Sequence, residues 1–236
     1  MTKTTKPVTN FGVILIYLAV FGVFIFLQVF AVLFFDLTAI DLTEANVQTF
    51  GAITTLLMYI TMTVLLIYYL RIYLLKNQLP IFFQRIHFSI SLIFLGLFLM
   101  FMTSLLAGAF MQAIGIDGVS DNQAAIEAML GAGWYTVLMV FIFSVFLAPI
   151  VEELVFRKAI FGLVTEKTGN LAAIFISALF FALIHVITDP IMILSYFPLG
   201  LVLGFMYYYS GKVILVPIFM HFGWNLFAIT VALLVS

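Results

Sequence analysis

The sequence predicts an all-α, polytopic membrane protein. Of its 236 residues, 66% are hydrophobic and 8% are charged, whereas an average soluble domain is about 45–50% apolar and about 25% charged. The apolar residues also form runs close to the roughly 20 residues that a helix needs to cross the bilayer core. No long polar stretch separates these runs. We therefore expect one membrane domain covering residues 1–236.

Seven apolar runs are predicted to be membrane spans: 11–35, 50–75, 88–113, 134–164, 171–187, 191–209 and 213–235. The fourth run contains Pro149, and it would give an eighth span if the helix broke there. Two loops have the spacing of a helix-capping box, Asp41-Leu-Thr-Glu44 and Ser120-Asp-Asn-Gln123. The second box is expected to begin a short helix at the membrane surface.

Basic residues occur at alternate ends of the predicted spans. The N-terminal tail, the second loop, the segment after the fourth span and the sixth loop carry Lys or Arg, whereas the first and third loops carry only acidic charges. Lysine and arginine are enriched in cytoplasmic loops. The pattern therefore predicts a cytoplasmic N-terminus and an external C-terminus, in a protein whose first partner is membrane lipid.

The charge and cysteine counts exclude several classes of function. There are 9 Lys and Arg against 10 Asp and Glu, without a basic block, so a nucleic-acid partner is not expected. The absence of cysteine excludes disulfides, thiol nucleophiles and thiolate metal sites. Composition leaves the oligomeric state open.

Ionisable residues within the predicted spans are confined to the last four spans. Such residues cost about 2.5–3.5 kcal/mol each at the centre of a membrane helix, and they commonly mark functional sites. We therefore divide the chain into N-terminal scaffold spans, 11–113, and a C-terminal catalytic half, 134–235. The polar residues of that half are Glu152, Glu153, Arg157, His185, His221 and Asn225.

Helical spacing predicts which of these side chains share a face. Glu153 and Arg157 are four residues apart and are expected to pair, whereas Glu152 points about 100° away from Glu153 and needs another partner. His221 and Asn225 also share a face. A rise of ~1.5 Å per residue places Glu152, His185 and His221 at similar depths, about 22–32 Å from the outer boundary. This depth corresponds to the cytoplasmic half of the membrane.

A carboxylate, two imidazoles and an amide at one depth favour hydrolysis. The carboxylate can activate a water molecule, and the imidazole and amide N–H groups can stabilise an oxyanion. The same residues, Glu152, His185 and His221, could instead hold one divalent metal such as Zn²⁺, because a catalytic zinc site can use two histidines and one glutamate. The usual His-Glu-x-x-His motif is absent, and spacing leaves both alternatives open.

The order of these motifs resembles the CPBP intramembrane protease family, which includes the CAAX-prenyl endopeptidases and the bacterial Abi proteins. The resemblance covers about a third of the chain. The matching residues are Glu152-Glu153-x-x-x-Arg157, Phe181-x-x-x-His185 and His221-x-x-x-Asn225. It implies that Glu152 activates water with help from His185, and that His221 and Asn225 bind the oxyanion. It also implies that Glu153, Arg157 and Phe181 support the site, and it leaves the need for a metal unsettled.

The expected function is therefore cleavage of a peptide bond in a membrane-associated peptide or protein, in a bacterial cytoplasmic membrane. The resemblance implies a role in peptide processing, bacteriocin self-immunity or envelope signalling. One alternative is a non-catalytic membrane partner, for example of a sensor kinase. Another is a proton-coupled transporter, since Glu and His chains also relay protons. The absence of an inverted repeat argues against the transporter.

Overall fold

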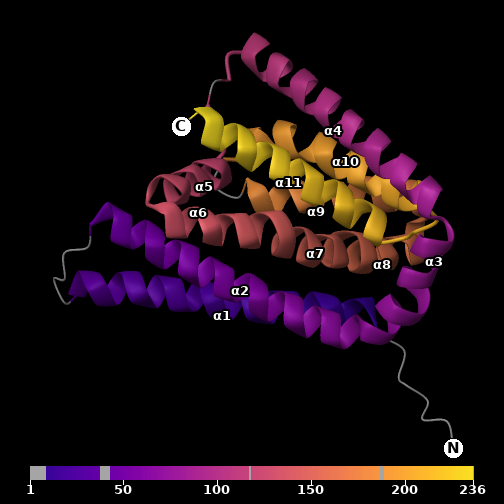
Figure 1. Ribbon diagram of the computed structural model, residues 1–236, viewed down its shortest axis with the longest axis horizontal. Coiled ribbons are helices and arrows are strands. Elements are labelled where there is room, and N and C mark those ends of the chain that lie inside the picture. Colours follow the sequence, from indigo (N-terminus) through magenta and orange to yellow (C-terminus); the bar gives the residue numbers. More distant parts are fainter. Residues whose placement is uncertain (1–8, 38–42, 117, 187–188, 236) are drawn as a thin grey trace, which may run out of the picture.

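The computed structural model describes residues 9–37, 43–116, 118–186 and 189–235. All regular structure in these ranges is helical. The helices α1 (Asn10–Leu37) and α2 (Glu44–Tyr73) run side by side along one face, and α4 (Ile86–Ala113) lies on the opposite face (Figure 1). The remaining helices pack between them, so the polar residues of the C-terminal half lie inside the molecule.

Six helical runs within the described residues are long and apolar enough to cross a membrane, and the chain is an integral membrane protein. These runs are Asn10–Phe35, Glu44–Gln84, Ile86–Ala113, Trp134–Thr168, Pro190–Tyr209 and Leu215–Val235. The second run continues beyond α2 through a π-helical turn, η1 (Leu74–Gln78), into α3 (Leu79–Gln84). Its last part turns the chain toward α4.

Six of the seven predicted spans are long enough to cross a membrane, and the fifth is a shorter apolar helix. The fifth predicted segment forms α9 (Asn170–His185), which has 16 residues. At ~1.5 Å per residue this helix is about 24 Å long, which is shorter than the ~30 Å hydrocarbon core. The chain returns from its end through η4 (Pro190–Met192) into α10 (Ile193–Tyr209). On either side of this turn, Val186 and Met192 form one buried cluster with Met111 near the end of α4.

The fourth run stays one helix through Pro149, so the suggested eighth span does not form. The run passes through α6 (Trp134–Val140), the π-helix η2 (Phe141–Leu147), α7 (Ala148–Glu153), the π-helix η3 (Leu154–Ile160) and α8 (Phe161–Thr168). Pro149 stands in the first turn of α7, directly after the wider turns of η2. Within a helix, proline removes one backbone hydrogen bond and its ring crowds the preceding turn; here that turn is the wider π-helical turn of η2, and the helix continues.

The second predicted capping box is confirmed in its Ser120 N-cap, whereas the Gln123 side chain bonds Glu127. The Ser120 hydroxyl accepts a hydrogen bond from the Gln123 backbone N–H, at 3.2 Å, and begins α5 (Asp121–Gly131). For the first box, Asp41 lies outside the described residues, and the N-cap of α2 is Thr43. The Ser120 hydroxyl also bonds the Tyr196 hydroxyl on α10, at 2.9 Å. This bond ties α5 to the α9–α10 hairpin.

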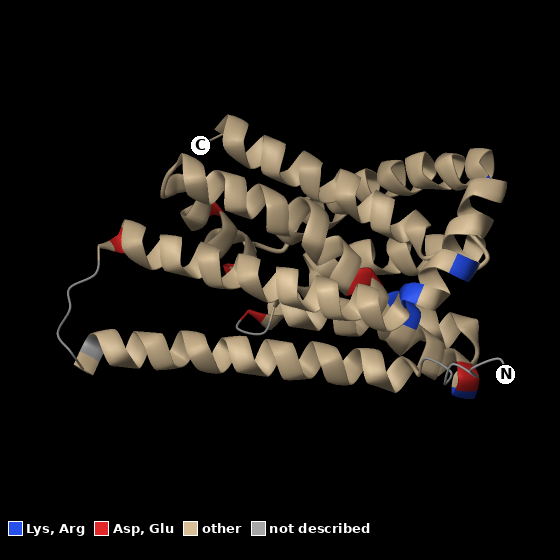
Figure 2. Ribbon diagram, turned by 60° about the horizontal axis from the view of Figure 1, so that its bottom comes forward, with Lys and Arg blue, Asp and Glu red and all other residues tan. Residues whose placement is uncertain are grey.

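Charged residues are sorted by the ends of the bundle (Figure 2). Outside the polar site, the described Lys and Arg residues lie at one end: Arg71, Lys76, Arg85, Lys158, Lys167 and Lys212. The acidic residues Glu44, Asp121 and Glu127 lie at the other end, on α2 and α5, and Glu166 lies at the basic end. We call these the basic end and the acidic end. The final helix, α11 (Leu215–Val235), runs from the basic end to the acidic end.

Candidate active site

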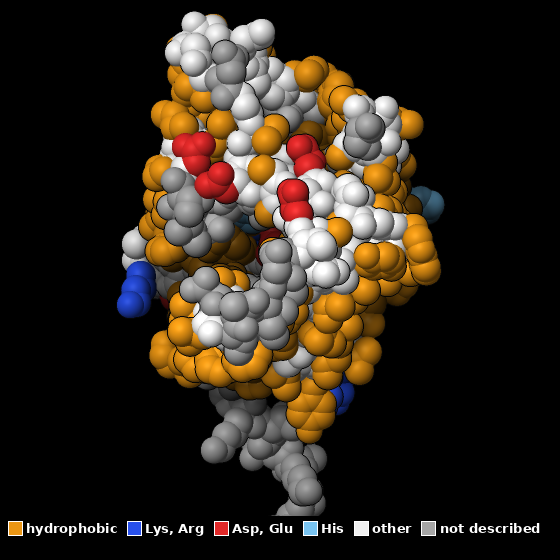
Figure 3. Space-filling model, turned by 90° about the vertical axis from the view of Figure 1, so that its left-hand side faces the viewer, with side chains coloured by type: hydrophobic (Ala, Val, Ile, Leu, Met, Phe, Trp, Pro, Cys, Tyr) orange, Lys and Arg blue, Asp and Glu red, His pale blue; other side chains and the backbone are white. Residues whose placement is uncertain are grey.

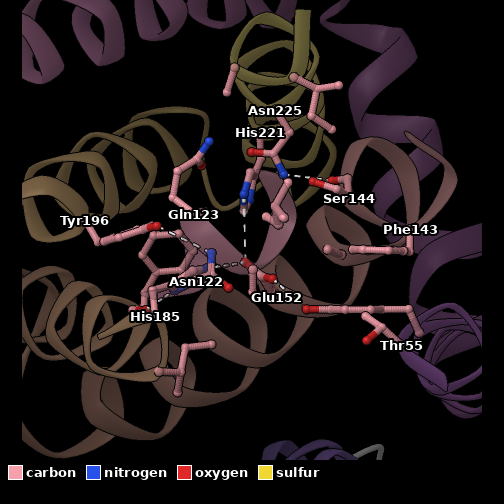
Figure 4. Close-up of a pocket in the computed structure, with 18 of the residues that line it drawn as sticks. Thr55, Asn122, Gln123, Phe143, Ser144, Glu152, His185, Tyr196, His221 and Asn225 are labelled. Atoms are coloured by element: carbon pink, nitrogen blue, oxygen red, sulfur yellow. Dashed lines mark hydrogen bonds and ion pairs between the residues drawn. The ribbon is translucent and has the colours of Figure 1, made fainter. Parts of the chain in front are cut away.

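Four of the six polar residues of the C-terminal half line one cavity of about 360 Å³ inside the bundle. Glu152, His185, His221 and Asn225 all line it, from α7, α9 and α11 (Figure 4). Segments far apart in the sequence are thereby brought together, as the depth argument predicted. The cavity lies in the range of about 300–1,000 Å³ that is typical of ligand sites.

Glu152 lies at the centre of this group. Its Oε1 atom accepts a hydrogen bond from the Tyr59 hydroxyl, at 3.2 Å. Its Oε2 atom lies 3.7 Å from His185 Nε2 and 3.8 Å from His221 Nε2, and it is buried without a hydrogen-bond partner. A buried carboxylate oxygen without a partner is costly. This atom is therefore placed to accept a proton from a molecule in the cavity.

The orientation of each histidine is fixed by its other nitrogen. His185 Nδ1 lies 2.7 Å from the Phe181 carbonyl oxygen, which can only accept, so this nitrogen carries a proton. His221 Nδ1 lies 2.9 Å from Glu153 Oε1. Both Nε2 atoms are thus left facing Glu152. Such partners on the far nitrogen set the ring orientation and the tautomer.

Glu153 and Arg157 form the predicted pair, and the structure adds a second partner for the glutamate. The Arg157 Nε atom lies 3.1 Å from Glu153 Oε2, without hydrogen-bond geometry. Both side chains are fully buried. Arg157 Nη2 donates to the Gly200 carbonyl oxygen on α10, at 3.1 Å. Glu153 therefore connects Arg157 to His221, so the pair does more than join two turns of one helix.

Asn225 follows His221 by one turn of α11. Its Nδ2 atom donates to the Ser144 carbonyl oxygen, at 2.8 Å. That carbonyl belongs to η2, so the wider turns of this π-helix supply an acceptor that faces α11. An amide group has two N–H donors, and the bond to Ser144 uses one of them. The second can serve a molecule in the cavity.

Two aromatic rings pack against the histidines. Phe181 packs against His185 and His221, with ring centroids 4.7 and 5.7 Å apart, and the Arg157 guanidinium lies 4.7 Å above the same ring. Tyr196 stacks on His185 with a centroid distance of 4.7 Å. The predicted supporting residue Phe181 therefore contacts both histidines and the arginine.

Sequence reasoning missed the residues of the site that come from outside residues 134–235. Tyr59 comes from α2 within the predicted scaffold, and its ring stacks on Phe143. Asn122 and Gln123 enter the cavity wall from α5. Tyr196 belongs to the C-terminal half but was not singled out. A tyrosine among many aromatic residues in a span carries no signal of its own, so the sequence offered none for Tyr59.

The predicted metal ligands match a metal site in chemistry but not in spacing. Two imidazole nitrogens and a carboxylate oxygen are a known zinc donor set, and neighbouring ligands at the usual bond length of about 2.0–2.1 Å are roughly 3.3 Å apart. The corresponding separations here are 3.7 and 3.8 Å. Within the described residues, no group of three His, Asp or Glu side chains is arranged to hold a metal ion.

Comparison with known proteins places this site in a family. Residues 133–227 match the profile of the family "Type II CAAX prenyl endopeptidase Rce1-like". The chain is 34% identical over 139 residues to "Putative membrane peptidase YdiL" of Bacillus subtilis (strain 168), covering 58% of this chain and 54% of that protein. It is 31% identical over 144 residues to "UPF0177 protein YvdC" of Lactococcus lactis subsp. lactis (strain IL1403), covering 61% of this chain and 53% of that protein.

The chain spans about half the length of the curated relatives that it matches. No solved structure is significantly similar to it. The family match includes the residues that carry the resemblance, from Glu152 to Asn225. Over this segment, the chain is similar to the Rce1-like type II CAAX prenyl endopeptidase family, also known as CPBP.

Proposed function

We propose that this protein is an intramembrane peptidase in which Glu152 activates the attacking water. The observation that carries the proposal is the unpartnered, buried Oε2 atom of Glu152, which faces both histidine Nε2 atoms across the cavity. A water molecule there donates one proton to Oε2 as its oxygen attacks the peptide carbonyl. The C–N bond then breaks, and Glu152 returns the proton to the leaving amine.

His185 assists as a neutral base. Its Nδ1 proton is held by the Phe181 carbonyl oxygen, so Nε2 keeps a lone pair toward the cavity. This nitrogen accepts the second hydrogen bond of the attacking water and orients its oxygen. Tyr196 stacked on one face of the ring keeps the imidazole in place.

His221 and Asn225 stabilise the oxyanion. Glu153 accepts from His221 Nδ1, and an imidazolium at His221 balances the site: two carboxylates, Glu152 and Glu153, face two cations, His221 and Arg157. Balanced charge lowers the cost of burying ions in an apolar interior. The Nε2–H of His221 and the free N–H of Asn225 then donate to the tetrahedral intermediate.

The proposed substrate is a membrane-associated peptide or protein, and the proposed location is a bacterial cytoplasmic membrane with the N-terminus in the cytoplasm. The charge sorting between the two ends of the bundle supports this orientation through the enrichment of Lys and Arg in cytoplasmic loops. The resemblance supports roles in peptide processing, bacteriocin self-immunity or envelope signalling.

The test compares peptide termini in membranes of cells that carry the wild type, Glu152→Gln or Glu166→Gln at matched levels. Glu166→Gln is the matched control, because it removes a carboxylate at the basic end, outside the cavity. We expect fragments with the wild type and the control that are absent with Glu152→Gln. Identical termini in all three would refute peptidase activity, and an unchanged phenotype would then favour the non-catalytic membrane partner.

A further inference from the structure

The cavity extends from the site toward the acidic end of the bundle. On α1 its lining residues run from Tyr17 to Gln28, and on α11 they run from His221 to Ala232. Each stretch advances eleven residues along its helix, which is about 16 Å at ~1.5 Å per residue. The lining residues of α1 and of α11 thus give the same length for the cavity along the bundle. The cavity is a channel of that depth with Glu152 at its inner end.

Packed side chains close the opposite direction. Between the site and the basic end lie large side chains with less than 2% exposure. They come from α2, from η3 and α8, and from the segment before α11: Met62, Leu66, Leu70, Leu154, Phe161 and Ile214. None of these residues lines the cavity. The direction toward the basic end is therefore closed to water and to a peptide chain, whereas the cavity extends toward the acidic end.

The open end carries negative charge. Figure 3 shows the molecule from this end, with a hollow that contains histidine and carboxylate atoms and with acidic side chains beside it. Glu127 on α5 accepts a hydrogen bond from Gln123 Nε2, at 2.9 Å, and Gln123 lines the cavity. Outside the polar site, the described Lys and Arg residues belong to the basic end. The mouth of the channel therefore attracts cations and repels anions.

We propose that the substrate is a cationic peptide segment that enters through the acidic end and threads inward to Glu152. This inference rests on the proposed peptidase function and names the substrate class of that site. The amide and hydroxyl groups of the channel wall, at Gln28, Thr55 and Asn122, suit an extended backbone that has no secondary structure of its own.

The channel depth sets a minimum length for the substrate. An extended chain covers about 3.3 Å per residue, so about five residues are needed to span 16 Å. The cleaved bond is therefore at least about five residues from any folded part of the substrate. In the proposed orientation, the acidic end faces away from the cytoplasm. Access is then external, although the site was placed in the cytoplasmic half of the membrane.

The test measures the accessibility of single cysteines, which is unambiguous because the chain has no cysteine of its own. Ala228→Cys reports on the channel, because Ala228 lines the cavity on α11. Ala124→Cys, exposed on α5 and outside the cavity, reports which membrane side the acidic end faces. Ala159→Cys, fully buried in η3, reports on the closed side. Each is treated with membrane-impermeant cationic and anionic methanethiosulfonates from either side of the membrane.

We expect Ala228→Cys to react only from the side from which Ala124→Cys reacts, and Ala159→Cys to react from neither side. Reaction of Ala228→Cys from the opposite side, or from neither side, would overturn the access route, as would reaction of Ala159→Cys. These readouts need no cleavage. A failed peptidase test with a confirmed channel would therefore refute the proposed function alone, and the reverse result would refute the channel alone.

The charge of the substrate is tested by the two reagents. Relative to a free thiol, Ala228→Cys should favour the cationic reagent by roughly ten-fold, within the 10–10³ range by which charged clefts concentrate ions. Adding Glu127→Gln should lower this preference, whereas Glu166→Gln at the basic end should not. The fragments that depend on Glu152 should carry net positive charge. No reagent preference, or neutral or acidic fragments, would overturn the cationic substrate.

Discussion

Replacing Arg157 by methionine tests the buried charge network most directly. The guanidinium is fully buried and lies 3.1 Å from Glu153, with one further hydrogen bond to the Gly200 carbonyl oxygen. Removing it leaves a buried carboxylate with His221 as its remaining partner at 2.9 Å. Breaking a buried ion pair on one side costs about 3–5 kcal/mol. We expect Arg157→Met to lower the free energy of unfolding by about 3 kcal/mol, because His221 still compensates part of the charge.

The double variant Glu153→Gln/Arg157→Met separates the cost of an unpaired charge from the value of the pair. It removes both charges, and the glutamine carbonyl still accepts from His221 Nδ1. If the two single substitutions acted independently, their losses of unfolding free energy would add to about 6–8 kcal/mol. We expect the double variant to lose roughly 2–3 kcal/mol. Arg71→Met is the control. Arg71 is exposed and contacts Tyr68, so this change should cost less than about 1 kcal/mol.

Unfolding can be followed in mixed micelles by the fluorescence of the two tryptophans as the fraction of denaturing detergent rises. One of them, Trp224, lines the cavity and reports on the site itself. Wild-type stability of Arg157→Met would refute the reasoning. So would a double variant whose loss equals the sum of the two single losses, since the three side chains would then not be coupled.

Two further predictions concern residues that the structure alone brought forward. Tyr59→Phe keeps the ring that stacks on Phe143 but removes the hydrogen bond to Glu152 Oε1. A hydrogen bond to a charged group contributes about 1.5–3 kcal/mol, so stability should fall by up to that amount. The kcat of the folded variant should fall at least about ten-fold, and an unchanged kcat would refute this positioning role. In Gly200→Ala, the new Cβ would lie 3.1 Å from backbone atoms of α9, whereas in Gly204→Ala it would meet a side-chain methyl at 3.3 Å. Gly200→Ala should therefore cost about 1–3 kcal/mol of stability, and it should lower the unfolding temperature in detergent more than Gly204→Ala does. The reverse order would contradict the close packing of α9 on α10.

The sequence alone determined the class of the protein, because composition and run length depend on no tertiary contact. It also determined the Glu153–Arg157 pair, since residues four apart on a helix must share a face. The motif order around Glu152, His185 and His221 was sufficient to indicate the family. The division into scaffold spans and a catalytic half, and the catalytic roles themselves, remain predictions.

Only the tertiary structure decided what surrounds Glu152. Tyr59 approaches it from a distant helix, and Glu153 reaches His221 across the bundle; these contacts depend on helix packing, which hydrophobic runs do not encode. The length of α9 and the unbroken helix at Pro149 also depend on context, because α5 is tied to the α9–α10 hairpin and η2 precedes the proline. The direction in which the cavity opens is likewise a property of packing: buried side chains close one end, and polar and acidic side chains border the other.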